Sequence, residues 1–421
     1  MHAFPLCSFV LPLCPSWLIF FSNSREQEET HNQPQATMFP VRVLISAGEA
    51  SGEMYGAQLI EALRRRDPAL EFFGVGGERM REAGCDTIID ASDLSVVGIT
   101  EILGHLPKIW RLFHKLIDEA DLRQPDLAIV IDSPAFNWRV ARQMKKRDIP
   151  VIYYVAPQFW AWRQGRVRLL RKYITKALVI FPFEEKFYRD RRVDTTFVGH
   201  PLAELPPPSI TREDYAAQFN LDLANQWVTI MPGSRVKEVR LNLPTMLDAT
   251  ALLGGGFEFL LPVAATIDRQ LLAESTKGRG ITLVSGAHPA LYHSRAAIVA
   301  SGTATVEAAM MGTPFVMVYR VSQLTYTLGK PRIKVPYFAM VNLIAGERIV
   351  PELVQGDFTA ERVVARLREI LPDGPTRTTM LEGLARVKAR LRSPSERGSA
   401  ADRAADAVLA LASHEVKSQS A

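Results

Sequence analysis

The residues best suited to chemistry stand at the end of an apolar run in the second half of the chain. Residues 296–300 are predicted to form a buried strand that stops at a Ser-Gly-Thr turn, residues 301–303, and a helix is predicted from there to Gly312. Such a turn leaves backbone N–H groups free at the helix start, where an anionic group is stabilised. Glu307 lies one turn further along and can face the same place. The pattern fits a phosphate at the turn with a ribose on Glu307, and it fits a solvated glutamate equally well.

A second turn of small residues follows the strand predicted at residues 227–230. It reads Met-Pro-Gly-Ser-Arg and ends at Arg235. The Ser234 hydroxyl and the backbone of this turn can meet a phosphate, and the Arg235 guanidinium can pair with it. The two turns together outline a site for a nucleoside diphosphate.

Two carboxylates follow predicted strands in the first half of the chain. Asp132 stands directly after the strand predicted at residues 127–131, and ligands of open α/β sheets bind beyond the carboxyl ends of the strands. Glu49 lies in the small-residue turn after the first strand, residues 41–45. Asp132 is therefore a candidate general base or an N-cap of the next helix, and Glu49 is either a ligand contact or a turn carboxylate.

An aromatic and basic loop follows the strand predicted at residues 151–155. Two tryptophans, Trp160 and Trp162, are costly to expose, so we expect them to line a pocket or an interface. The cationic residues that come next form either a solvated face or a surface for phosphate; they are Arg163, Arg166, Arg168, Arg171 and Lys172.

Residues 96–117 carry apolar side chains at helical spacing, with Pro107 expected to break or kink the helix. Basic residues are interleaved with the stripe. It is either a core helix with a basic outer face or a surface that inserts apolar side chains into lipid. The predicted membrane or acyl contacts are Ile99, Leu103, Leu106, Trp110 and Phe113.

These residues need two sheets to position them. Strands and helices alternate in both halves of the chain, which predicts an α/β fold with two Rossmann-like, doubly wound domains facing a cleft. We place the first domain, with about six strands, at residues 38–200 and the second at 210–372, joined by a Pro-rich hinge. Residues 373–421 are predicted to form helices that pack back on the N-terminal domain or on a partner subunit. Residues 1–37 are expected to be a disordered or non-native-start extension, with a membrane anchor as the alternative.

Composition narrows the class of protein. A net charge of +5 with a pI of about 9.1 is too small to argue for nucleic acid but suits anionic substrates or an anionic membrane surface. Three cysteines give no disulfide framework and fit a reducing compartment. The sequence has no P-loop, no Gly-x-Gly-x-x-Gly followed by an acidic residue, no Gly-x-Ser-x-Gly and no clustered His or Cys ligands.

Seven motifs in order resemble the lipid-A-disaccharide synthase family. They are Ser46-Ala-Gly-Glu-Ala-Ser-Gly, Ile131-Asp-Ser-Pro-Ala-Phe-Asn, Tyr154-Val-Ala-Pro-Gln-Phe-Trp-Ala-Trp-Arg-Gln-Gly-Arg-Val, Phe197-Val-Gly-His-Pro, Pro232-Gly-Ser-Arg, Ser301-Gly-Thr-Ala-Thr-Val-Glu and Asn342-Leu-Ile-Ala-Gly. The resemblance implies the GT-B fold and an inverting glycosyltransferase that joins UDP-2,3-diacylglucosamine to 2,3-diacylglucosamine 1-phosphate and releases UDP. It implies no metal or other cofactor, a cytoplasmic protein peripheral on the inner membrane, and no nucleic acid partner, and a homodimer is kept open.

The resemblance also assigns site residues. The catalytic candidates are Asp132 and Glu49. The expected substrate contacts are Ser46, Gly48, Ser51, Asn137, Gln158, Trp160, Trp162 and Arg163. The expected UDP contacts are Gly233, Ser234, Arg235, Ser285, Ser301, Gly302, Thr303, Glu307 and Asn342.

One departure from the family pattern concerns the Asp132 motif. The family usually reads Ile-Asp-x-Pro-Asp-Phe-Asn, and here the second Asp is Ala135. Two rival functions follow. One is another UDP-sugar enzyme of the same fold, a UDP-sugar epimerase or a lipid-linked N-acetylglucosaminyl transferase. The other is a UDP-sugar-binding or lipid-binding protein whose catalysis was lost with that carboxylate.

Overall fold

The structure is a computed structural model that describes residues 41–48, 50–94, 99–161, 163–323, 326–327, 333, 335–392 and 398–419, with the backbone alone at residues 50, 99–106 and 413–419. The chain divides into two compact units, Met1–Phe39 and Pro40–Ala421, and the second contains all of these residues. The extension at residues 1–37, Glu49 and Trp162 lie outside the described residues, as do the side chains of Ile99, Leu103 and Leu106.

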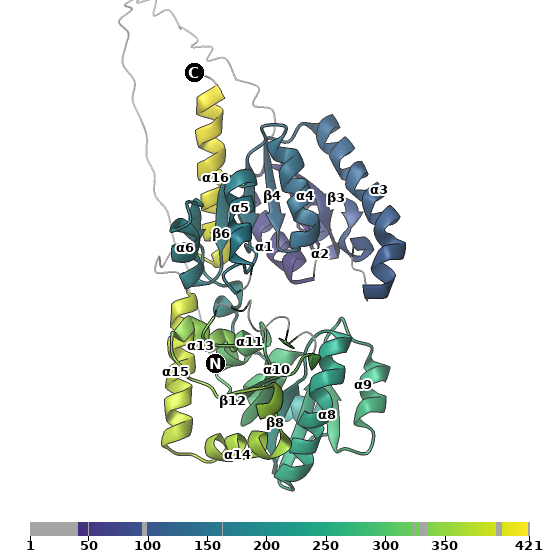
Figure 1. Ribbon diagram of the computed structural model, residues 1–421, viewed down its shortest axis with the longest axis vertical. Helices are drawn as coiled ribbons and strands as arrows, with labels where there is room; N and C mark the ends of the chain where they lie inside the picture. Colours follow the sequence, from purple (N-terminus) through teal and green to yellow (C-terminus); the bar gives the residue numbers. More distant parts are fainter. Residues whose placement is uncertain are drawn as a thin grey trace, which may run out of the picture. The chain divides into compact units, whose positions relative to one another are not determined.

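The N-terminal lobe is built on a seven-stranded parallel sheet (Figure 1). Its order is β3 (Cys85–Asp90), β2 (Glu71–Gly76), β1 (Arg42–Ala47), β4 (Leu127–Ile131), β5 (Val151–Tyr154), β6 (Lys176–Val179) and β7 (Thr195–Phe197). The central strands β1, β4 and β5 are buried at every position except Arg42 because helices cover both faces of the sheet. The edge strand β3 has exposed and half-buried positions, and the sequence did not predict it.

The C-terminal lobe has a six-stranded parallel sheet. Its order is β10 (Ile281–Val284), β9 (Phe257–Pro262), β8 (Gln226–Met231), β11 (Ala296–Ala300), β12 (Phe315–Tyr319) and β13 (Glu352–Val354). Strand order reverses between β1 and β4 in the first sheet and between β8 and β11 in the second. In open α/β sheets the ligand crevice lies beyond the strand ends at such a reversal.

At least one helix connects each strand to the next along the chain. In the N-terminal lobe the α-helices are α1 (Ala50–Arg66), α2 (Glu78–Glu82), α3 (Ile99–Arg123), α4 (Pro134–Lys145), α5 (Val167–Tyr173) and α6 (Pro182–Arg189). The other α-helices of the described residues are α7 (Arg212–Phe219), α8 (Val236–Leu253), α9 (Arg269–Thr276), α10 (Ala287–His293), α11 (Ala304–Met311), α13 (Met340–Ala345), α14 (Ala360–Ile370), α15 (Pro375–Leu391) and α16 (Ala400–Gln419). Alternate residues of β1 face two different cores: Ile45 packs in one with α1, and Leu44 packs in the other with α3 and α4.

The last helix, α16, packs on α1 of the N-terminal lobe, although α15 before it belongs to the C-terminal lobe. Arg66 pairs with Asp402 at 2.9 Å and with Asp406 at 2.7 Å. Arg403 Nη2 lies 2.6 Å from Glu204 Oε1 in the segment that joins the lobes. The chain therefore returns to the lobe in which it began.

One prediction about local structure is corrected. Pro107 does not end its helix, because α3 continues through it from Ile99 to Arg123. The Asn342 motif forms the helix α13, which ends at Gly346 with φ 73°.

Candidate active site

A cavity of about 440 Å³ lies at the carboxyl ends of the strands and takes its lining from both sheets. The N-terminal lobe contributes Asp132, and the C-terminal lobe contributes Glu307. Other predicted site residues that line it are Ser51, Gln158, Arg163 and Thr303. The two acids, 175 positions apart in the sequence, are thus brought to one cavity, as an enzyme with a two-part substrate requires.

The turn that carries Asp132 is held in an unusual backbone conformation. Asp132 and Ser133 have φ values of 47° and 41°, the left-handed region that non-glycine residues rarely occupy. Tyr153 Oη donates to Asp132 O at 2.7 Å, and Asn137 Nδ2 donates to Ile131 O and Asp132 O, both at 2.9 Å. A position over-determined in this way is typical of functional sites. The N-cap of α4 is Ser133, so Asp132 does not take the capping role that was its alternative.

The side chains of Ser46 and Asn137 support this turn. Both are fully buried, and Ser46 Oγ donates to Asn137 Oδ1 at 2.7 Å. The prediction that they contact the substrate is wrong, because their polar atoms are used to fix the backbone around Asp132. Gly48 lies against the same turn: a Cβ there would stand 2.6 Å from Ser133 Oγ, so the close approach requires glycine.

The aromatic loop is held by a buried glutamate that the sequence analysis did not single out. Trp160 is 5% exposed, and its Nε1 donates to Glu184 Oε1 at 2.7 Å. Glu184 Oε2 accepts from the N–H of Phe181 at 3.1 Å. Trp160 therefore packs behind the residues that line the cavity, and its contact with substrate stays a prediction. The indole N–H of a buried tryptophan needs such a partner.

We expect Glu184 to make stability depend on pH. Burial raises the pKa of Glu184 from 4.5 to about 8, so between these values the folded chain holds a proton that the unfolded chain releases. The contribution of Glu184 to the free energy of unfolding should then be fully present below pH 4.5 and should fall by up to about 1.4 kcal/mol per pH unit as the pH rises toward 8. In Glu184→Gln this part of the slope should vanish, as thermal unfolding at a series of pH values would show.

Glu185→Gln is the matched control, since Glu185 is the next residue of α6 and is partly exposed. It should keep the pH slope of the wild type. A Glu184→Gln variant whose melting temperature follows the wild type at every pH would contradict the assignment.

On the C-terminal side, Glu307 has a partner that the sequence analysis missed. His288 Nε2 lies 3.3 Å from Glu307 Oε2, and both residues line the cavity. His288 follows the carboxyl end of β10 by four residues, so its place after a strand was the available signal.

The Ser-Gly-Thr turn at residues 301–303 precedes α11. Ser301 Oγ donates to Phe338 O at 2.8 Å, and Thr303 takes the N-cap position without a side-chain hydrogen bond.

The turn at residues 233–235 holds an anionic group of its own. Ser234 N donates to Glu238 Oε2 at 3.1 Å, and Arg235 Nη1 donates to Glu238 Oε1 at 3.2 Å. Gly233 has φ 124°, and a Cβ there would stand 2.5 Å from Glu238 Oε2. These residues and the exposed Ser285 are not part of the cavity lining among the described residues. The two donors nevertheless converge on one carboxylate, as they would on a phosphate oxygen pair.

Asn342 has a structural role that corrects its assignment to UDP. Its side chain is fully buried: Nδ2 donates to Val350 O and Glu352 Oε1, and Oδ1 accepts from the backbone N–H of Ile349 and Val350. All four bonds lie between 2.9 and 3.0 Å and fasten α13 to the segment before β13. Nothing of the amide is left for a ligand.

Two further cavity residues, Tyr55 and His200, were not in the predicted site. Burial, then the charges of Glu307 and Asp132, raise the pKa of Tyr55, so its hydroxyl stays a donor. His200 is 1% exposed, and burial lowers its pKa to about 3, which keeps the imidazole neutral. The Gly-His-Pro motif was the signal for His200.

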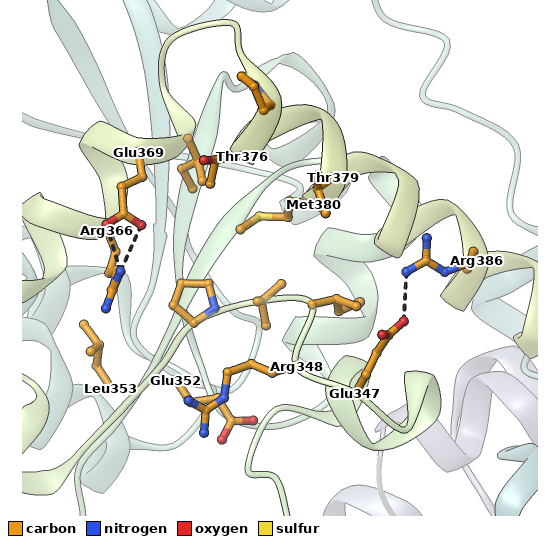
Figure 2. Close-up of a pocket in the computed structure, with 15 residues that line it drawn as sticks. Glu347, Arg348, Glu352, Leu353, Arg366, Glu369, Thr376, Thr379, Met380 and Arg386 are labelled. Atoms are coloured by element: carbon orange, nitrogen blue, oxygen red, sulfur yellow. Dashed lines mark hydrogen bonds and ion pairs between the residues drawn. The ribbon is translucent and has the colours of Figure 1, made fainter.

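Figure 2 shows a second cavity, of about 600 Å³, bordered by the segment before β13 and by α14 and α15. Two of the three arginines that line it are paired: Arg366 with Glu369 at 2.8 Å and Arg386 with Glu347 at 2.9 Å. It contains neither Asp132 nor Glu307, so the smaller cavity between the strand ends is the candidate active site. Within the described part of the chain, no group of three or more His, Cys, Asp or Glu side chains is placed to hold a metal ion.

Comparison with known families agrees with this geometry. A family model described as lipid-A-disaccharide synthetase matches residues 43–402. The lipid-A-disaccharide synthase of Koribacter versatilis is 53% identical over 378 residues, which cover 88% of this chain and 99% of its own. That of Acidobacterium capsulatum is 48% identical over 368 residues, covering 84% and 92%.

Solved structures that resemble this one are remote in sequence. The UDP-GlcNAc 2-epimerase of Neisseria meningitidis bound to UDP-GlcNAc has a TM-score of 0.60 at 11% identity, covering 88% of this chain and 99% of its own. A calicheamicin glycosyltransferase has a TM-score of 0.56 at 16% identity, covering 89% and 98%. These neighbours establish the GT-B fold and nothing about chemistry. The relatives that are 48% and 53% identical do not favour the epimerase or the catalytically silent protein as alternatives. The chain belongs to the lipid-A-disaccharide synthase family of glycosyltransferases in lipid A biosynthesis.

Proposed function

We propose that this enzyme transfers diacylglucosamine from UDP-2,3-diacylglucosamine to the 6-hydroxyl of 2,3-diacylglucosamine 1-phosphate, with inversion. The observation that carries the proposal is that Asp132 and Glu307 share one cavity between two lobes. Apolar residues such as Ile180, Phe181 and Leu202 line the same cavity, which suits substrates that carry acyl chains.

Asp132 is proposed as the general base. Its carboxylate takes the proton of the acceptor hydroxyl as that oxygen attacks the anomeric carbon, and the bond from that carbon to the UDP oxygen breaks on the opposite side. Of the described residues that line the cavity, two are carboxylates, and Glu307 already pairs with His288. Asp132 follows the carboxyl end of β4 in the N-terminal lobe, which supports its role although Ala135 replaces the second Asp of the family motif.

Charge that develops on the departing diphosphate is proposed to be neutralised by Arg235 and by the backbone N–H groups of Gly302 and Thr303. The N–H of Ser301 donates to Val318 O at 3.0 Å and is already used. Thr303 lines the cavity at the start of α11, and Glu307, one turn later, is proposed to bind the ribose. His288 would hold the Glu307 carboxylate toward the cavity.

The proposal is tested by incubating the protein with UDP-2,3-diacylglucosamine and 2,3-diacylglucosamine 1-phosphate and following product mass. A disaccharide 1-phosphate of the summed mass, less UDP, is expected. UDP release that needs no acylated acceptor would contradict it, as would UDP binding with no product.

The membrane surface is proposed as a further partner, through α3. Trp110 is 58% exposed and stacks on Phe113, with ring centroids 6.0 Å apart. The exposed basic residues Arg111, His114 and Lys115 lie near it on the helix. Phe113 itself is 5% exposed and packs edge-on against Phe136, so the proposed contact rests on Trp110 and not on Phe113. No helix among the described residues is both long and apolar enough to cross a bilayer.

Replacing Trp110 by Glu should weaken binding to vesicles that contain anionic lipid by about tenfold or more, because an inserted ring is lost and a negative charge faces the head groups. Flotation of the protein with such vesicles measures the bound fraction. Tyr292→Glu is the control, since Tyr292 is an aromatic residue, 46% exposed, in the other lobe. Equal flotation of both variants and the wild type would rule out the α3 contact.

A further inference from the structure

His200 presents a buried hydrogen-bond donor to the active-site cavity. Its imidazole is 1% exposed, and Nδ1 accepts from the N–H of Leu202 at 3.1 Å. That bond fixes the tautomer with the ring proton on Nε2. Nε2 is buried and has no hydrogen-bond partner among the residues that the structure describes. An unsatisfied buried donor is costly and calls for an explanation.

The surroundings of His200 are apolar. The Phe181 ring lies 5.3 Å from the imidazole, centroid to centroid, and Ile180, Leu202 and Leu205 line the same cavity. A neutral donor in an apolar wall suits a neutral acceptor better than a phosphate, for which the chain offers arginines. A sugar hydroxyl both donates and accepts hydrogen bonds. If it accepted from His200 in this apolar wall, the proton of the hydroxyl would have no acceptor there.

We propose that His200 Nε2–H donates a hydrogen bond to an acyl carbonyl oxygen of the bound acceptor sugar, with the apolar wall receiving the chain beyond that carbonyl. An acyl group fits both features of this site: its carbonyl oxygen accepts a hydrogen bond, and its methylenes pack against the apolar wall. The inference rests on the proposed function, because it assumes an acylated acceptor. It deepens that proposal by naming which chemical feature of the substrate this residue selects.

The position of His200 in the chain assigns the contact to the acceptor. The residue lies three positions after the end of β7 in the N-terminal lobe, the lobe that carries Asp132. Its backbone N–H donates to Leu391 O at 2.9 Å, so the main chain is held by α15 whatever the side chain does. A substitution of the imidazole therefore leaves this backbone anchor in place.

His200→Phe and His200→Gln separate the donor from the shape of the ring. Phe keeps an apolar ring without the N–H, and the Gln amide nitrogen reaches the place of Nε2. We expect His200→Phe to raise the KM for 2,3-diacylglucosamine 1-phosphate about fivefold to tenfold, with kcat, the KM for UDP-2,3-diacylglucosamine and the Kd for UDP unchanged. His200→Gln should recover most of the loss.

Glucosamine 1-phosphate is the probe that lacks acyl groups. Its binding, measured by calorimetry, should be the same for the wild type and His200→Phe, whereas binding of the diacylated acceptor should weaken. If both acceptors weaken by the same factor, the partner is a sugar hydroxyl and the inference is overturned. It is also overturned if neither weakens, or if Gln is as impaired as Phe. A wild type that binds the diacylated acceptor but makes no disaccharide would instead refute the proposed function, and the binding comparison would still test His200.

Discussion

Asp132→Asn should lower the turnover number about 10²- to 10⁴-fold, the range that general-base catalysis contributes, while UDP binds as in the wild type. The amide cannot accept the proton of the acceptor hydroxyl. The substitution should not disturb the fold, because asparagine tolerates the left-handed conformation at this position, where φ is 47°. The bonds that hold the turn, from Tyr153 and Asn137, end on the backbone oxygen of residue 132 and survive the change. Product mass gives turnover, and calorimetry gives the Kd for UDP.

Asp126→Asn is the matched control. Asp126 precedes the same strand, β4, at its opposite end, and its carboxylate accepts from Arg42 N at 2.8 Å. An amide oxygen keeps that bond, so the variant should turn over like the wild type. If Asp132→Asn lost UDP binding and turnover by the same factor, Asp132 would be a structural residue of the turn instead of the base.

Arg235→Ala should lower the turnover number about 10²- to 10³-fold, as removal of a group that stabilises developing charge typically does. The guanidinium and the Ser234 N–H already converge on one carboxylate, that of Glu238. The Arg235 side chain is 73% exposed, and an exposed pair of this kind is worth at most about 1 kcal/mol, so a diphosphate with more charge can displace Glu238. Alanine removes the cation and leaves the helix α8 intact.

Arg240→Ala, a few residues along α8, removes the same charge from an exposed position away from the turn. It should retain turnover close to that of the wild type. Equal activity of Arg235→Ala and Arg240→Ala would show that the diphosphate is held elsewhere.

The sequence predicted the acids of the cavity well because parallel sheets bring strand ends together. Asp132 follows β4 and Glu307 lies one turn into the helix after β11, and both positions could be found from the apolar runs before them. Strands β3 and β13 were missed because one has exposed and half-buried positions and the other has three residues. Edge strands of this kind lack the continuous apolar signal of the central ones.

Roles of individual polar side chains were harder to predict. Ser46 and Asn137 are 91 positions apart, so no local pattern indicated that each is the other's hydrogen-bond partner. Asn342 satisfies backbone groups of its own segment, and a motif alone does not distinguish that from binding a ligand. Tyr55 enters the cavity through the packing of distant elements, which no local pattern indicates.

The return of α16 to α1 has a consequence for synthesis on the ribosome. Ala404, Ala405 and Val408 are buried in the same core as Leu59, so the first lobe to emerge lacks part of its cover until the second lobe and α16 have been made. A nascent chain cut off before residue 398 would leave that apolar face open to water and to chaperones. The lobe whose synthesis begins first is therefore completed only after the other one.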